Sequence, residues 1–303
     1  MIVLVPLTDG SRKRELPDDR RIIAPMKRNL NGMVAIITGA SAGIGRALAD
    51  QLSAAGAKLV LAARREDRLH QLNEQLGGRH LVVATDVSDP EQCQRLIQRA
   101  AEHFGRIDTL ICNAGYGLPK PVAQMSLQEF QAIFQTNLFG TIDCIRPAVP
   151  MMSKQELRDG FRGQIVIISS AAGRRGLPWF GAYSATKAAQ LSIAESLRIE
   201  LQPVKIAVTS VHPIGTDTDF FTTAEKLSGA TIPPRSAVER HQSAETVAKA
   251  IIRGIRRPIP EIWPMRVVRI LVAMGILMPR LTDWVMSKHR RALGNANNSP
   301  NVP

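Results

Sequence analysis

Thr38-Gly39-Ala40-Ser41-Ala42-Gly43-Ile44-Gly45 is the stretch that decides the fold, because it joins an apolar run to a segment with helical periodicity. The first glycine permits a tight turn, the second lets the backbone approach a pyrophosphate, and the third allows the helix to pack closely on the strand. The N-terminus of such a helix offers free N–H groups and a positive dipole to phosphate. The stretch therefore predicts a strand, a phosphate-binding turn and a helix, in preference to an ordinary turn.

Outward from this turn, short apolar runs alternate with helical stretches. The runs are nearly continuous in Val, Ile, Leu and Ala, as in parallel strands that are buried on both faces. They cover residues 33–38, 58–62, 81–85, 109–112, 164–169 and 205–211. Residues 259–263, between Pro258 and Pro264, fit only an edge strand. We predict an α/β fold with a doubly wound parallel sheet of about seven strands and helices on both faces.

Length and composition favour one folded domain with an extension at each end. A chain of 303 residues, 45% hydrophobic and 21% charged, suits a large α/β domain in the cytoplasm. We assign residues 30–264 to this domain and residues 265–303 to an apolar and basic helical tail. Residues 1–29 form an N-terminal extension that we expect to be disordered or to precede the true start at Met26; a targeting role is the alternative. Cys93, Cys112 and Cys144 lack the spacing of metal sites, so we expect reduced thiols and no metal.

The glycine spacing is G-x-x-x-G-x-G rather than the G-x-G-x-x-G of most dinucleotide-binding folds. In this spacing the chain resembles the short-chain dehydrogenase/reductase family over about residues 30–264. The resemblance implies a single Rossmann-type domain and an oxidoreductase that moves a hydride between a nicotinamide cofactor and a carbonyl or alcohol carbon. It also implies cofactor contacts by the turn residues Thr38, Gly39, Ser41, Gly43, Ile44 and Gly45.

The residues after the second apolar run indicate which cofactor is bound. An acidic side chain there would accept hydrogen bonds from the ribose 2′-hydroxyl and select NAD. Ala63 stands at that position and is followed by Arg64 and Arg65, which suit a 2′-phosphate. We predict NADP(H), with NAD(H) less favoured and two merely solvated arginines as the alternative.

Three further segments match family motifs at the ends of predicted strands. The residues that the resemblance places on the cofactor are Asp86, Val87, Asn113, Ala114, Gly115, Pro213, Ile214 and Thr218. Asp86 would accept a hydrogen bond from the adenine amino group, and Asn113 would tie strands together near the cofactor. Two departures stand out: Cys112 replaces an asparagine, and Gly215 is displaced by one residue in the last motif. His212 is expected to pack at a strand end rather than to take part in catalysis.

A second constellation predicts the chemistry. Tyr183 and Lys187 are four residues apart, and positions i and i+4 share a helix face. A nearby cation favours the phenolate, so we expect the pKa of Tyr183 to fall toward neutrality, as a general acid or base requires. The resemblance implies that both residues also contact the cofactor, Lys187 through the nicotinamide ribose hydroxyls.

The same resemblance completes a tetrad with Asn137 and Ser170. Ser170 lies thirteen residues before Tyr183, and its hydroxyl would donate to the substrate carbonyl oxygen; Ser169 is the alternative. Asn137 matches an asparagine whose carbonyl holds a water linking the lysine to solvent. We predict Asn137, Ser170, Tyr183 and Lys187 as the catalytic residues.

The C-terminal part of the chain carries more than half of the net charge of +13, with nine Lys and Arg against two acidic residues in residues 253–303. Its longest uncharged run, residues 270–279, is about half of a bilayer span. We expect a helix that packs on protein or, alternatively, lies on an anionic membrane surface. Residues 220–242 have the composition of a mobile lid, and the apolar tail beside it favours a hydrophobic substrate.

Three functions compete for this sequence. An NADP-dependent oxidoreductase acting on a small-molecule carbonyl or alcohol is favoured, because the four tetrad positions occur in order. The alternatives are a non-catalytic dinucleotide-binding scaffold or sensor and a basic nucleic-acid binder. Aromatic residues make up only 4% of the chain and the charge gathers at one end, which disfavours nucleic acid. We expect a cytoplasmic or membrane-associated homo-oligomer, a dimer or a tetramer.

Overall fold

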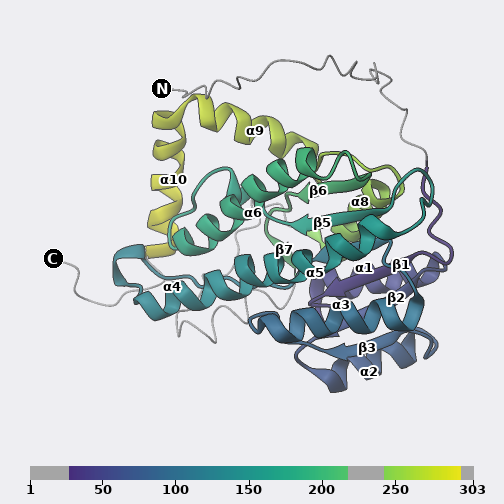
Figure 1. The fold of residues 1–303 in the computed structure, drawn as a ribbon. Coiled ribbons are helices and arrows are strands. Elements are labelled where there is room, and N and C mark those ends of the chain that lie inside the picture. Colours follow the sequence, from purple (N-terminus) through teal and green to yellow (C-terminus); the bar gives the residue numbers. More distant parts are fainter. Residues whose placement is uncertain (1–26, 218–241, 295–303) are drawn as a thin grey trace, which may run out of the picture.

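The computed structural model describes residues 27–217 and 242–294, and its centre is a parallel sheet of seven strands (Figure 1). The strands follow the order β3-β2-β1-β4-β5-β6-β9, so the chain moves from β1 to one edge and then to the other. Their bounds are β1 Val34–Thr38, β2 Lys58–Ala63, β3 Leu81–Ala84, β4 Thr109–Cys112, β5 Gly163–Ile168, β6 Ile206–Val211 and β9 Glu261–Ile262. The predicted α/β fold with a doubly wound sheet is confirmed.

Helices cover both faces of the sheet, and each face has its own core. Alternate residues of a strand point to opposite faces. Ile37 therefore packs with residues of α1 and α8, whereas Ile36 packs with residues of α3, α5 and α6. The helices are α1 Gly43–Ala54, α2 Glu66–Gln75, α3 Pro90–Phe104, α4 Leu127–Phe134, α5 Gly140–Lys154, α6 Gly181–Glu200, α8 Ala244–Arg256, α9 Arg266–Leu277 and α10 Pro279–Gly294. A small second sheet pairs β7 Thr216–Asp217 with β8 Gln242–Ser243.

The edge strand β9 lies where the sequence predicts it and is shorter than predicted. Two of its residues pair with β6, and its neighbour Pro260 takes part only through its carbonyl, which accepts from the Ser210 N–H at 3.0 Å. Proline has no N–H to donate to the ladder. The prolines around β9 therefore confine the strand to the edge of the sheet and limit its length.

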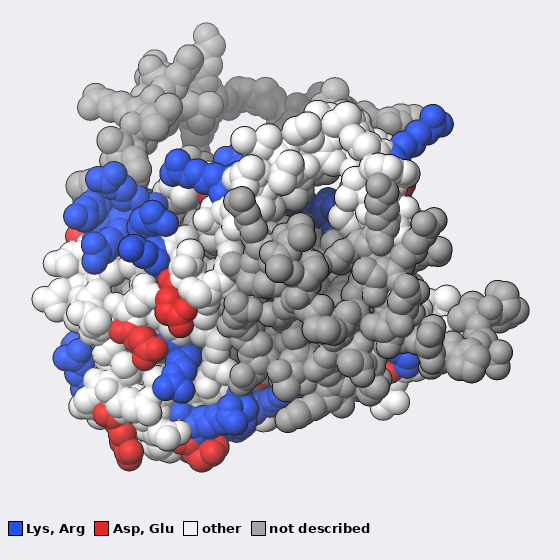
Figure 2. Space-filling model, turned by 180° about the vertical axis from the view of Figure 1, so that it is seen from behind, with Lys and Arg blue, Asp and Glu red and all other residues white. Residues whose placement is uncertain are grey.

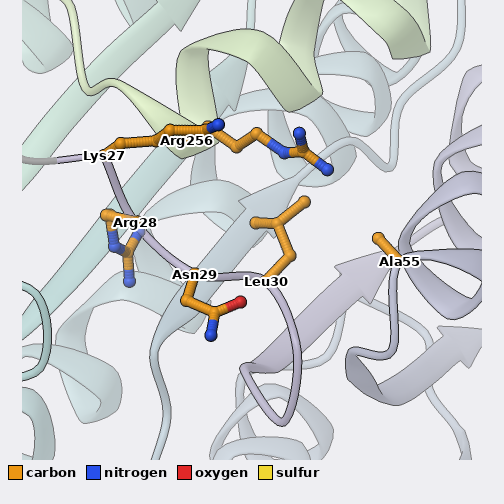
Figure 3. Close-up of a pocket in the computed structure, with 6 residues that line it drawn as sticks. All are labelled: Lys27, Arg28, Asn29, Leu30, Ala55 and Arg256. Atoms are coloured by element: carbon orange, nitrogen blue, oxygen red, sulfur yellow. The ribbon is translucent and has the colours of Figure 1, made fainter.

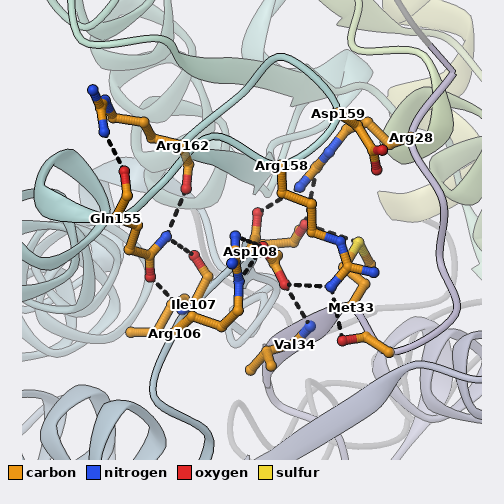
Figure 4. Close-up of polar contacts among 12 residues, drawn as sticks. Arg28, Met33, Val34, Arg106, Ile107, Asp108, Gln155, Arg158, Asp159 and Arg162 are labelled. Atoms are coloured by element: carbon orange, nitrogen blue, oxygen red, sulfur yellow. Dashed lines mark hydrogen bonds and ion pairs between the residues drawn. The ribbon is translucent and has the colours of Figure 1, made fainter.

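A buried polar network fastens the start of the described chain at the amino ends of β1, β4 and β5 (Figure 4). Asp108, only 1% exposed, accepts hydrogen bonds from the Val34 N–H at 2.9 Å, from Arg106 at 2.9 Å and from Arg158 at 3.3 Å. The Arg28 guanidinium donates to Gln164 Oε1 at 2.6 Å and to the Asp108 carbonyl at 2.9 Å. From the sequence we placed Arg28 in the N-terminal extension and began the domain at residue 30. In the structure Arg28 is buried in this network and belongs to the packed domain.

A shallow hollow lies beside this network, lined by Lys27, Arg28, Asn29, Leu30, Ala55 and Arg256 (Figure 3). Its lining residues precede β1 or end α1 and α8, so it opens at the edge of the sheet where the strands begin. On the face drawn in Figure 2, the described Lys and Arg side chains form separate patches with Asp and Glu side chains between them. That part of the surface offers no continuous basic stripe of the kind that follows a phosphate backbone.

The two C-terminal helices carry mostly exposed side chains over residues 266–287, the part of them whose side chains the structure describes. Residues of α9 make no buried contribution, and α10 stands on the side of the sheet to which β5 and β6 point (Figure 1). α9 contacts the short η3 turn, Ala171–Gly173, and Asp283 of α10 pairs with Arg175. Within the described ranges no single helix is long and apolar enough to span a bilayer; α9 and residues Pro279–Ser287 meet that test only together and with a bend of 111°.

Candidate active site

The carboxyl ends of β1, β4, β5 and β6 meet at one edge of the sheet and bring together the residues that the sequence singled out. In a doubly wound sheet this edge is where ligands bind, at the point where strand order reverses beside β1. The glycine turn follows β1, Asn113 follows β4, Ser170 follows β5 and Pro213 follows β6. Tyr183 and Lys187 reach the same edge from α6.

The glycine turn has the geometry that a dinucleotide needs. Gly39 has a φ of +69° and Gly43 a φ of +53°, conformations that favour glycine. A Cβ on Gly45 would lie 2.2 Å from the Gly39 carbonyl oxygen and 2.7 Å from Asn113 Nδ2. α1 therefore begins directly against the turn, where its N–H groups and dipole favour a pyrophosphate. The residues present fit the expected cofactor.

Thr38 and Asn113 hold this turn rather than point away from it. The Asn113 amide donates to the Thr38 carbonyl at 2.9 Å and to the Gly39 carbonyl at 3.3 Å. The Thr38 hydroxyl accepts from the N–H groups of Asn113 at 3.0 Å and Ala114 at 3.1 Å. These bonds tie β1 to β4, so both side chains act on the cofactor site by fixing its backbone.

The two arginines after β2 are exposed and lie beside the turn. Arg65 donates to Ser41 Oγ at 3.3 Å. Burial raises the pKa of Tyr116, and the charge of Arg64 acts against this rise, so Arg64 faces the segment that follows β4. Ala63 ends β2 without a carboxylate. This part of the site therefore presents two cations where a dinucleotide's adenosine ribose would lie.

Asp86, Val87 and the segment after β6 have structural partners. Asp86 Oδ1 accepts from the Ser88 N–H at 2.9 Å and the Ser88 hydroxyl at 2.7 Å, as in an Asx turn. Val87 packs so closely on α5 that a Cβ on Gly140 would lie 2.5 Å from the Val87 carbonyl oxygen. The Pro213 carbonyl accepts from the Ala171 N–H at 3.0 Å.

Of the other residues singled out after β6, the structure describes His212 and Ile214. His212 stacks on Trp263 with ring centroids 4.5 Å apart, and burial lowers its pKa to about 4; it packs, as expected. Ile214 is half-buried and its carbonyl accepts from Thr216 Oγ1 at 2.8 Å. Thr218 and residues 220–241 of the lid predicted at residues 220–242 lie outside the described residues, and Gln242 lies in β8. Cys112 is buried at the end of β4, and Cys93 and Cys144 are buried and unbridged as well.

Tyr183 and Lys187 lie together in the first half of α6. Lys187 Nζ is 5.6 Å from the centre of the Tyr183 ring and donates to the Ile168 carbonyl at 2.7 Å. Burial lowers the pKa of Lys187 to about 7. Burial also raises the pKa of Tyr183 to about 12, which a hydrogen bond from Ser170 only partly opposes.

This shift corrects the prediction that the lysine would bring the tyrosine pKa toward neutrality. Lys187 is buried and Tyr183 is half-buried, and removal from water disfavours the charged form of each. A lysine whose own pKa is near 7 carries less charge at neutral pH than the prediction assumed. In the chain alone, Tyr183 is therefore a protonated phenol, the form that can donate a proton to a carbonyl oxygen.

The two serines that end β5 have separate roles in the structure. Ser170 Oγ bonds Tyr183 and also accepts from the Ala172 N–H at 3.1 Å. Ser169 Oγ donates instead to the Lys187 carbonyl at 2.8 Å and is buried. Ser170 is thus the serine that lies beside the phenol, and Ser169 supports the helix.

Asn137 lies in a π-helical turn, Gln135–Phe139, rather than in a regular helix. Its amide group accepts from the Tyr116 N–H at 2.9 Å and donates to the Tyr116 carbonyl at 2.9 Å and to Thr186 Oγ1 at 3.1 Å. A Cβ on Gly115 would lie 2.9 Å from Asn137 Oδ1 and 3.7 Å from Lys187 Nζ. π turns often mark functional sites, and this one brings Asn137 against Gly115, next to the lysine.

The sequence did not lead us to predict a role for Gln190 at this site. Gln190, three residues after Lys187 on the same helix, accepts from Lys187 Nζ at 3.0 Å and donates to the Asn137 carbonyl at 2.6 Å. The i, i+3 spacing was a signal that could have drawn attention to it. Its contact with Asn137 joins α6 to the π turn, which are far apart in the sequence, so no local sequence pattern predicts it.

Comparison with known proteins agrees with this geometry. The short chain dehydrogenase family profile matches residues 33–227. An 11-beta-hydroxysteroid dehydrogenase-like protein 4A from Arabidopsis thaliana is 36% identical over 272 residues, 86% of this chain and 85% of the relative. A dehydrogenase/reductase SDR family protein 7-like from Anopheles gambiae is 32% identical over 279 residues, 88% of this chain and 86% of the relative.

Solved structures with nicotinamide cofactors show the same likeness. A short chain dehydrogenase/reductase from Burkholderia phymatum in complex with NAD has a TM-score of 0.73 and 27% identity, covering 84% of this chain and 96% of that one. An alcohol dehydrogenase from the archaeon Thermococcus sibiricus, complexed with 5-hydroxy-NADP, has a TM-score of 0.66 and 28% identity, covering 76% and 95%.

Fold and site together define an oxidoreductase that uses a nicotinamide dinucleotide. The chain belongs to the short-chain dehydrogenase/reductase family.

Proposed function

We propose that this enzyme uses NADP(H) to interconvert a hydrophobic carbonyl compound and its alcohol, with Asn137, Ser170, Tyr183 and Lys187 as its catalytic residues. The observation that carries the proposal is the meeting of Ser170, Tyr183 and Lys187 beside the glycine turn. The bound dinucleotide supplies or accepts the hydride at its nicotinamide ring.

The side chains supply the proton chemistry. In the reducing direction, Tyr183 donates its proton to the carbonyl oxygen, and Ser170 stabilises the charge that develops there. Lys187, four residues along the same helix, stabilises the phenolate that remains and binds the nicotinamide ribose. Asn137 fixes the backbone of Tyr116 against this group. In the oxidising direction each step reverses.

Replacing Tyr183 by phenylalanine tests the catalytic assignment. The variant keeps the ring and loses the proton donor, so turnover should fall at least about 100-fold, the lower range for general acid catalysis, while NADPH affinity changes little. Steady-state kinetics and NADPH fluorescence titration measure the two effects. Tyr116→Phe is a matched control, because Tyr116 is the only other tyrosine; it should retain activity. Full turnover by Tyr183→Phe contradicts the assignment.

Preference for NADP(H) is supported by Ala63 at the end of β2 and by the two exposed arginines that follow it. A guanidinium recognises a phosphate through charge and paired hydrogen bonds that a ribose hydroxyl cannot match. Arg64→Ala and Arg65→Ala should each weaken NADPH binding about 10-fold or more and leave NADH binding nearly unchanged. Arg99→Ala, an exposed arginine of α3, should affect neither cofactor. Equal losses for NADPH and NADH with Arg64→Ala and Arg65→Ala would refute the phosphate role.

A hydrophobic substrate is supported by the apolar helices next to the site. α9 contacts η3, the turn that directly follows Ser170, and its exposed side chains include Ile270, Leu271 and Leu277. The relatives named for 11-beta-hydroxysteroid dehydrogenase agree with this class of substrate. Purified enzyme with NADPH should reduce ketones or aldehydes with kcat/KM rising as the apolar part of the substrate grows. A preference for small polar carbonyl compounds would contradict it.

The same helices support a peripheral membrane contact. Exposed apolar side chains of α9, of α10 and of the residue between them are Val267, Ile270, Leu271, Met274, Ile276, Leu277, Met278, Leu281, Trp284 and Val285. Arg266, Arg269 and Arg280 are exposed on the same two helices. Apolar side chains gain free energy by leaving water for the bilayer interface, and nearby basic side chains are attracted to anionic lipid headgroups. We therefore place this surface on a membrane that contains anionic lipid.

A further inference from the structure

Gln190 occupies the space between Lys187 and Asn137. It lies in α6 one turn after the lysine and is 1% exposed. Its Oε1 accepts from Lys187 Nζ at 3.0 Å. Its Nε2 donates to the Asn137 carbonyl at 2.6 Å and to Thr141 Oγ1 at 2.9 Å. The amide thus joins α6 to the π turn and to the first turn of α5.

The orientation of this amide is fixed by its partners. A lysine ammonium only donates hydrogen bonds and a backbone carbonyl only accepts them. Oε1 must therefore face Lys187, and Nε2 must face Asn137. Thr141 Oγ1 fits the same scheme, because it donates to the Asn137 carbonyl at 2.9 Å and can accept from Nε2. Every polar atom of this buried amide has a partner, which makes the arrangement rigid.

The Asn137 carbonyl is the group for which the family resemblance implied a water linked to the lysine. In this chain a side-chain amide already makes both of those bonds. We propose that Gln190 is a positioning residue of the active site, which takes the place of that water and holds the Lys187 ammonium against Ile168 and Tyr183. The proposal rests on the proposed function, because the lysine must serve Tyr183 for its position to matter.

Loss of the amide has a specific chemical consequence. Without Oε1 the ammonium keeps the Ile168 carbonyl as an acceptor and loses the other, so its charged form becomes less favourable in a buried site. A less charged lysine stabilises the Tyr183 phenolate less. In the oxidising direction, where the phenolate accepts the proton, the rise of rate with pH should then begin at a higher pH.

Gln190→Met tests the proposal, because methionine has a similar length and cannot accept the lysine's hydrogen bond. We expect kcat to fall about 10- to 100-fold, the range for a hydrogen bond to a charged group. The pH–rate profile should move upward by about half a unit to one unit. KM should change much less than kcat.

Gln190→Ala separates a positioning role from simple loss of packing. Alanine leaves a small cavity lined by Lys187 Nζ, the Asn137 carbonyl and Thr141 Oγ1, enough partners for a water. A water in this cavity should restore most of the activity and the original pH profile. Gln164→Met is the matched control: Gln164 is also fully buried and hydrogen-bonded, but it lies in the network around Arg28. It should lower the melting temperature and leave the pH profile unchanged.

A wild-type pH profile in Gln190→Met would overturn the proposal, and so would equal loss of activity in the Met and Ala variants. If Gln190→Met does not fold, Gln190→Leu, which also lacks an acceptor for Lys187, takes its place, and a wild-type pH profile in that variant would overturn the proposal. Failure of the proposed function is distinguishable, because Tyr183→Phe would then retain turnover. Melting temperature and NADPH affinity, measured on every variant, provide readouts besides activity.

Discussion

Lys187 shows most clearly how the site sets the properties of one residue. Burial brings its pKa from 10.5 to about 7, although Ile168 and Gln190 both accept its hydrogen bonds. A lysine that releases its proton near neutrality can change charge during a catalytic cycle. The same burial keeps Tyr183 protonated, with a pKa of about 12. The pair is thus prepared for proton donation, and the phenolate forms only when the lysine charge and the bound cofactor stabilise it.

The shifted lysine makes stability depend on pH in a known direction. The unfolded chain binds the lysine proton below about pH 10.5, whereas the folded chain binds it only below about pH 7. Stability therefore rises with pH between these two values and the cost of burying the charge is greatest below pH 7. The melting temperature of Lys187→Met relative to the wild type should be highest at pH 6 and should decline toward pH 10. Lys249→Met, at an exposed position of α8, controls for removal of a lysine. A difference that stays constant with pH would contradict the shift.

Single residues divide into those that sequence could assign and those that it could not. Tyr183 and Lys187 were predictable because their relation is local, one turn of one helix. Spacing from Tyr183 favoured Ser170 over Ser169, and the fold gives the physical difference, because the Ser170 hydroxyl bonds the phenol and the Ser169 hydroxyl bonds the Lys187 carbonyl. The sign of the Tyr183 shift was missed because a spacing of residues carries no information about burial.

At the scale of elements, the glycine turn is the part that tolerates change least. α1 starts so close to β1 that Gly45 has no room for a Cβ, which would meet the Gly39 carbonyl oxygen at 2.2 Å. The Gly39 carbonyl belongs to backbone that is held by Asn113, so it cannot move aside cheaply. The turn was also the most predictable feature, because steric limits on a phosphate-binding turn are written directly as glycine positions.

Gly45→Ala should therefore damage both the fold and the cofactor site. Separating α1 from the turn should lower the free energy of unfolding by about 1–3 kcal/mol, as in overpacked cores, and NADPH affinity should fall more than about 10-fold. Chemical denaturation and fluorescence titration measure these effects. Gly176→Ala is the control, because a Cβ there meets nothing within 4 Å. Unchanged NADPH affinity in Gly45→Ala would show that the turn does not hold the pyrophosphate.

Other elements show the limits of periodicity. The buried strands were found from continuous apolar runs, because a strand covered on both faces has no polar side to interrupt the run. β9 came out shorter than its run, since prolines beside it cannot donate to the ladder. The π turn at Asn137 could not be predicted, because one extra residue in a helical turn leaves no mark on the hydrophobic pattern. In the structure this turn lies between α4 and α5, and its Asn137 bonds the backbone of Tyr116.

At the scale of the whole molecule, the catalytic edge and the exposed helices lie on the same side. α10 stands where β5 and β6 point, and its Asp283 pairs with Arg175, between Ser170 and Tyr183 in the chain (Figure 1). A membrane bound to α9 and α10 would thus lie next to the site, and an apolar substrate could pass to it without crossing water. The expected dimer or tetramer stays a prediction, which light scattering of the purified protein would measure.

Binding to vesicles tests this arrangement. The protein should sediment with vesicles that mix phosphatidylcholine and phosphatidylglycerol, and should sediment less as salt rises, because Arg266, Arg269 and Arg280 contribute electrostatically. The double variant Leu271→Glu and Leu277→Glu places two charges among the exposed apolar side chains and should reduce binding at least about 10-fold. Leu127→Glu, at an equally exposed apolar position of α4, should bind as the wild type does. If the double variant instead dissociates an oligomer and leaves vesicle binding unchanged, the surface joins two copies of the chain and the membrane proposal is wrong.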